Sequence, residues 1–128
     1  MSARKSRNRL LRSLGFLVFS AAAVAGCGGA DNRPATFSFI GPAIIEPSCA
    51  TASCHSAVAA RANVVLEPRD TAYNTLLNRH FVIPMSPDDS EIMALIQAQG
   101  SQRMPPDFPL PPADIELISA WIQAGAPK

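Results

Sequence analysis

The chain has 128 residues, of which 48% are hydrophobic and 16% charged, so its composition is that of one folded domain and not of an intrinsically disordered protein. The net charge of +1 hides an asymmetry, because residues 1–26 carry five basic and no acidic side chains, whereas the rest carries six basic and ten acidic ones. Because the folded part is acidic, nucleic acid is disfavoured as a partner. Three cysteines are too few for a disulfide-rich scaffold. The sequence has no apolar run of twenty residues, which disfavours a transmembrane helix.

The N-terminal segment is typical of an export signal. Residues 1–13 are basic, and the apolar run Leu14–Ala23 is too short to span a membrane, as in a secretory signal peptide. The next residues, Val24-Ala25-Gly26-Cys27, resemble the lipobox of bacterial lipoproteins. The resemblance implies a signal peptide over residues 1–26, a lipid on Cys27 and export to a bacterial membrane, with Gly28 favouring the outer membrane, on its periplasmic or surface side. The alternative is an ordinary signal peptide with Cys27 left as a free thiol.

Residues 27–36 contain glycine and proline among polar residues, and they are predicted to form a flexible tether. The folded domain is then expected over residues 37–128. Its class is predicted to be all-α with about four short helices, and its many prolines predict long loops. Helices are expected near Ile40–Pro47 with interruptions at Pro42 and Pro47, from Ser53–Ser56 through Ala57–Ala60, after Asp70 as N-cap through Leu77, and after Asp88 or Asp89 through Ile96.

The last helix is expected to begin at Pro111 and Pro112 and to end before Gly125. Its apolar positions are Ile115, Ile118, Trp121 and Ile122. The segment before it, Met104–Pro112, contains five prolines in nine residues, so it is predicted to be a stiff extended wall.

The candidate chemistry lies in Cys49-Ala-Thr-Ala-Ser-Cys54-His55. A c-type haem is attached through two cysteines, and the histidine after the second one binds the iron, in the usual pattern C-x-x-C-H. Here four residues separate the cysteines, and on a regular helix their side chains would diverge by about 140°. The two extra residues are therefore expected to loop out, with Cys49 on the loop and Cys54-His55 at or near a helix start. The alternative is a Cys49–Cys54 disulfide.

A low-spin electron-transfer haem also needs a second axial ligand, often a methionine further along the chain. Met104 lies in a loop before proline, which restricts its backbone to extended conformations. Met85 and His80 are the alternatives. Met93 lies within an apolar helical pattern and is expected to pack in the core.

Taken in order, these segments resemble small class I cytochrome c domains of the subgroup ending in W-I-x-x-G-A. The matching segments are Cys49–His55, Leu66 with Ala72-Tyr73 and Leu76-Leu77, Val82-Ile83-Pro84 with Ser90, Arg103-Met104-Pro105, and Asp114-Ile115 through Trp121–Ala126. The pattern departs from the family in its wider cysteine spacing and in Met85, where relatives often have glycine.

The resemblance implies a cytochrome c-like fold around one covalent haem c. Cys49 and Cys54 would attach the haem, with His55 as proximal and Met104 as distal iron ligand. The expected function is single-electron transfer and not enzymatic catalysis, in a monomer with redox proteins as partners and a lipid contact with the membrane. Two alternatives are a haem-free binding lipoprotein with the disulfide, and a haem enzyme or sensor in which Met104 is labile.

Overall fold

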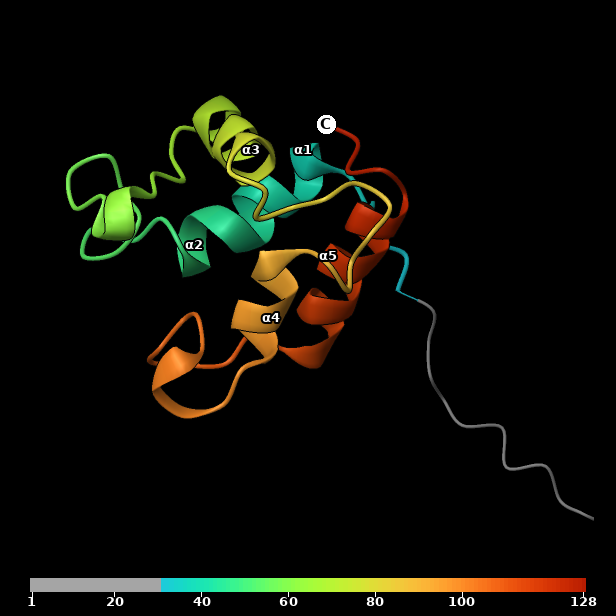
Figure 1. Cartoon of the computed structure of the whole chain (residues 1–128). Helices are drawn as coiled ribbons and strands as arrows, with labels where there is room; N and C mark the ends of the chain where they lie inside the picture. Colours follow the sequence, from blue (N-terminus) through green and yellow to red (C-terminus); the bar gives the residue numbers. More distant parts are fainter. Residues whose placement is uncertain (1–30) are drawn as a thin grey trace, which may run out of the picture.

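The computed structural model describes residues 31–128, which fold into helices joined by long loops (Figure 1). The elements in chain order are α1 (Phe37–Ile40), a π-helical turn (Gly41–Ile45), α2 (Glu46–Ser48), a 3-10 turn (Arg61–Asn63), α3 (Arg69–Asn78), α4 (Glu91–Gln97), a second 3-10 turn (Gly100–Gln102) and α5 (Pro112–Gln123). Because α1, the π-turn and α2 are continuous, four helical regions result, and residues 31–128 contain no strand. The predicted all-α class is therefore confirmed. Within this part of the chain, no helix is long and apolar enough to cross a bilayer.

The first helical region passes through both of its prolines, so the predicted interruptions at Pro42 and Pro47 are wrong. A proline removes one amide donor and crowds the preceding turn. Here the helix widens into a π-turn, in which the amide of Glu46 donates to the carbonyl of Gly41 five residues earlier. The widened turn accommodates the prolines, and the helical region continues to Ser48.

The helix predicted through the alanines of residues 57–60 is also wrong, because this stretch is a series of turns. Its amides are used elsewhere: the amide of Ala57 donates to the Glu67 carboxylate at 2.6 Å, and that of Ala59 to the Ser56 hydroxyl at 3.0 Å. Ala60 has a left-handed backbone, with φ of 41°. These local hydrogen bonds override the high helix propensity of alanine.

The other helices form near their predicted positions, but two predicted caps are wrong. Pro68 occupies the N-cap of α3, and the Asp70 carboxylate instead contacts the Lys128 ammonium at 2.8 Å. Ser90 occupies the N-cap of α4 in place of Asp88 or Asp89, and its hydroxyl donates to the carbonyl of Ser86 at 2.8 Å. Helix α5 ends as predicted, with Gly125 left-handed at φ of 93° after Ala124.

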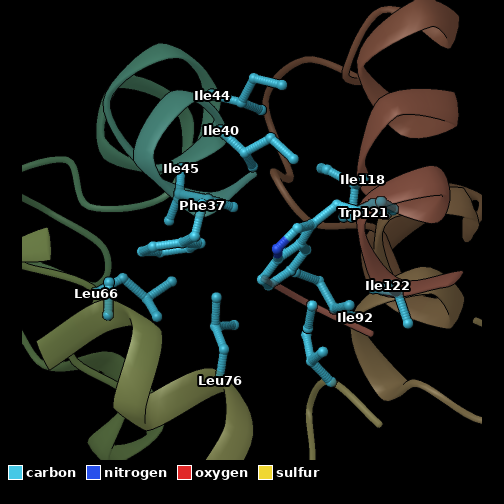
Figure 2. Packing of buried hydrophobic residues seen from close by; sticks show 14 of the residues in the cluster. Phe37, Ile40, Ile44, Ile45, Leu66, Leu76, Ile92, Ile118, Trp121 and Ile122 are labelled. Carbon is cyan, nitrogen blue, oxygen red and sulfur yellow. The ribbon is translucent and has the colours of Figure 1, made fainter. Parts of the chain in front are cut away.

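The core lies between α1 and α5 and is closed below by α3 (Figure 2). Phe37 and Trp121 are fully buried, with ring centroids 5.4 Å apart. The Trp121 indole N–H donates to the carbonyl of Pro127 at 2.8 Å, and the Phe37 amide donates to the same oxygen at 2.9 Å. The N-terminal start of the domain and its C-terminal tail are therefore joined at one place.

Residues 1–26 with their signal peptide, and Cys27 with its lipid, lie outside the described residues. Of the predicted tether, the described part contacts the domain, since the Arg33 guanidinium pairs with Asp31 at 2.7 Å and with Asp114 of α5. Ala35 packs against the core.

Candidate functional site

Two adjoining pockets, of about 430 and 470 Å³, lie where α2, α4 and the loops around residues 50–63 and 100–108 meet. Four residues line both pockets: Cys49, His55, Ala62 and Met104. Cys54 lines the second pocket. Segments some fifty residues apart in sequence thus converge on one hollow.

His55 is held by its own backbone and ring contacts. Its amide donates to the carbonyl of Cys49 at 3.1 Å, and its carbonyl accepts from the amide of Leu66 at 2.8 Å. The ring Nδ1 lies 3.3 Å from the carbonyl of Val64, which can only accept a proton. This contact places the ring proton on Nδ1 and leaves the Nε2 lone pair available to a metal, as in many metal-binding histidines.

The two cysteines are free thiols in different surroundings, so the disulfide of the alternative interpretation is not formed. Cys49 is the C-cap of α2, and burial, together with the nearby Cys54, raises the pKa of its thiol to about 11. Hydrogen bonds from the hydroxyls of Thr51 and Ser53 lower the pKa of Cys54. Both sulfurs border the second pocket.

The residues between the cysteines loop out, as the spacing predicts. Thr51, Ala52 and Ser53 are exposed, and the amide of Cys54 donates to the carbonyl of Thr51 at 2.9 Å. The expected placement of the ends is wrong, however: Cys49 ends a helix, and Cys54 and His55 lie in turns and not at a helix start. The unexpected continuation of the first helical region to Ser48 accounts for this difference.

Met104 is 38% exposed and borders both pockets. Its amide donates to the carbonyl of Leu95 in α4 at 3.0 Å. The Arg103 guanidinium donates to the carbonyls of Pro105 and Pro106 at 3.4 and 3.3 Å, which tightens the loop. Pro105 and Pro106 line the second pocket and form the wall that their stiffness predicts.

The alternative second ligands lie elsewhere. Met85 is 69% exposed, and its amide donates to the carbonyl of Ile122 at the end of α5. His80 is exposed just after α3. Neither residue lines either pocket, whereas Met104, His55 and both cysteines do. The ligand roles themselves stay predictions.

Four charged residues at or near the hollow were missed in the sequence. Arg79 and Glu91 line the first pocket, and the Arg79 guanidinium donates to the carbonyl of Asn63 at 2.6 Å while it stacks 5.3 Å from the Phe81 ring. Arg61 lines the second pocket, close enough to Cys54, as is Asp107, to influence the thiol electrostatically. None of these residues belongs to a sequence motif that would have indicated its place at the hollow.

The donor set and the walls fit a haem. An imidazole, a thioether sulfur and two thiols surround the hollow, whose volumes fall in the range of ligand and cofactor sites. The first pocket is walled mainly by apolar side chains, namely those of Ile45, Val64, Leu66, Leu76, Phe81, Ile92, Leu95, Ile96, Leu110 and Ile118. Arg61 and Arg79 are cations suited to the two carboxylates that a haem carries.

A family model described as Planctomycete cytochrome C matches residues 52–107. The matched stretch includes Cys54, His55 and Met104 and begins after Cys49. It is thus similar to a c-type cytochrome domain, a type that carries covalent haem c and typically transfers electrons without being an enzyme. Among curated proteins and among solved structures, no significant match to the chain is found.

Proposed function

We propose that the chain is a lipid-anchored monohaem c-type cytochrome that carries single electrons outside the cytoplasm. The observation that carries the proposal is that His55, Met104 and Cys49 line both pockets while Cys54 completes the second. In this proposal Cys49 and Cys54 would attach the haem, and His55 and Met104 would be the ligands of its iron. The cytochrome likeness of residues 52–107 supports the haem, and the pocket geometry supports the choice of ligands.

The residues around the hollow have defined tasks in this proposal. The carbonyl of Val64 orients the imidazole of His55 and increases the basicity of Nε2. The hydrogen bond to Leu95 positions Met104 on a loop that prolines stiffen. The apolar walls exclude water, and together with a thioether ligand they favour the reduced state. The bound haem supplies the one-electron couple of its iron.

The lipid on Cys27 completes the proposal. Several acyl chains on one cysteine anchor a protein stably, where a single chain binds only reversibly. The anchor places the carrier at a bacterial membrane, on the periplasmic or outer surface, and keeps it near its redox partners. Support for this part comes from the sequence of residues 1–27 alone.

The test is expression in a host that matures haem c. The intact mass should exceed that of the lipidated polypeptide by one haem, the haem should survive acid acetone, and the pyridine haemochrome spectrum should be that of two thioether bonds. Cys49→Ser and Cys54→Ser should each shift that spectrum towards one remaining vinyl group, whereas the matched control Ser53→Ala should not. Free thiols or a disulfide at residues 49 and 54 in such a host would refute the haem proposal.

A further inference from the structure

The tether enters the domain on the side away from the hollow. Figure 1 shows the loops of residues 50–63 and 100–108, hereafter the mouth loops, at one side and the entering N-terminal chain at the other. Phe37, the first residue of α1, is fully buried, and its amide donates to the carbonyl of Pro127. Arg33 adds an ion pair with Asp114. The point of entry is therefore fixed to the core by a buried aromatic ring.

The chain before this point is short compared with the domain. Six residue steps separate Cys27 from Arg33, which is a reach of about 20 Å when fully extended. The exposed Arg33 pair is weak, but without it the ten steps to Phe37 reach only about 35 Å. A compact unit of this length is about 30 Å across, so the path around it to the opposite side is about 50 Å. With a lipid on Cys27, the tether is therefore too short for the mouth loops to face the membrane that holds the lipid.

The mouth loops carry large exposed apolar side chains and few charges. Val58 is 94% and Phe108 79% exposed, although both are large apolar side chains. Pro105 and Pro106, on the same loop as Phe108, line the second pocket. The charges on these loops are two cations and one anion, namely Arg61, Arg103 and Asp107, so the acidic excess of the folded part lies outside them. Exposed apolar side chains gathered beside a site are typical of a protein-docking surface.

We propose that the mouth loops are a docking surface turned away from the anchoring membrane, for a redox protein that approaches from the aqueous phase and presents an apolar, weakly charged face. The inference rests on the proposed function, because it takes the lipid and the haem as given. It goes beyond it by naming the face that meets the partner and the side from which the partner comes.

The experiment measures which side of the lipidated holoprotein meets the bilayer. Once Cys27 carries lipid and Cys49 and Cys54 carry haem, an added cysteine is the one free thiol for a fluorophore. Val58→Cys places the label on a mouth loop, and Ala113→Cys, beside Asp114 on exposed backbone, places it on the tether side. Each protein is reconstituted in phosphatidylcholine vesicles with a nitroxide on the lipid headgroup, which quenches near contact. A second pair of proteins has thirty Gly/Ser residues inserted after Asn32.

With the native tether, the label at residue 113 should be quenched several-fold more than the label at residue 58. With the long tether the two should be quenched equally, because the added reach lets the domain turn freely. Equal quenching with the native tether, or stronger quenching at residue 58, would overturn the proposal. So would a dimer of the Cys27→Ser holoprotein that Phe108→Ser dissociates, because a second copy would then occupy the surface. Labelling of residues 49 and 54 would refute the haem proposal, and failure to bind vesicles would refute the lipid. Both outcomes are distinct from the quenching result.

Discussion

Alkylation of the haem-free chain at pH 8 should modify Cys54 well before Cys49. The thiolate is the reactive form of cysteine, so the two pKa values set the order. Burial raises the pKa of Cys49 to about 11, and the hydroxyls of Thr51 and Ser53 hold that of Cys54 below its ordinary value of 9.0. The Cys27→Ser chain without its signal peptide contains these two thiols alone.

The size of the difference follows from these values. At pH 8 a pKa of about 11 leaves roughly 0.1% of Cys49 as thiolate, whereas a pKa of 9 or below leaves at least roughly 9% of Cys54, which is a hundredfold difference. The more basic thiolate is intrinsically more nucleophilic, which offsets about tenfold over two pKa units. The rate should therefore differ by at least about tenfold.

The assay is a time course with iodoacetamide, quenched and read by peptide mass spectrometry. Urea at a concentration that unfolds the chain serves as the control, because both thiols should then react at similar rates. Equal rates in the folded chain, or Cys49 reacting first, would refute the assigned burial of Cys49 at the end of α2.

In the haem-free chain, folding raises the pKa of Cys49, so its contribution to the free energy of unfolding is complete below pH 9 and is lost as the pH rises towards 11, by roughly 2–3 kcal/mol; urea titrations of that chain should show this loss, and Cys49→Ser should abolish it. Trp121→Ala should cost about 3–5 kcal/mol of unfolding free energy, since it empties a fully buried position; a loss below about 1 kcal/mol would contradict the packing. Met104→Ala should keep the covalent haem, lower its potential and allow carbon monoxide to bind, whereas Met85→Ala should leave all three properties unchanged. Cys27→Ser should move the protein from the membrane to the soluble fraction with the same haem spectrum, and unaltered retention would argue against the lipid.

The parts of the fold predicted correctly depend on patterns that packing reinforces. The apolar stripe of α5, with Ile118, Trp121 and Ile122, is buried as its spacing predicts, and Gly125 ends the helix. The errors occur where local hydrogen bonds or distant partners compete with propensity. Lys128, at the far end of the chain, takes the carboxylate of Asp70 from its predicted cap, and no local pattern reveals such a partner.

The candidate site was predictable where a residue type carries the chemistry. The motif from Cys49 to His55 and the position of Met104 before proline pointed to residues that the structure brings to one hollow. The His55 ring finds its hydrogen-bond acceptor in the carbonyl of Val64, nine residues further along the chain. The charged residues Arg79 and Glu91 could not be found, because tertiary contacts bring them to the pocket: the amide of Ile92 in α4 donates to the carbonyl of Phe81, just after α3.

The hydrogen bond from the amide of His55 to the carbonyl of Cys49 joins the two ends of the segment between the cysteines and so closes it into a loop. Residues added to such a closed loop raise the entropic cost of closure only slowly with length, so the two cysteines can keep their positions. The number of residues between the cysteines can therefore vary at this site. The positions of the two cysteines are constrained by the hydrogen bond between His55 and Cys49. A chain with other small residues inserted beside Ala52 could keep the same pair of attachment points, which makes cysteine spacing a poor criterion for excluding relatives of this protein.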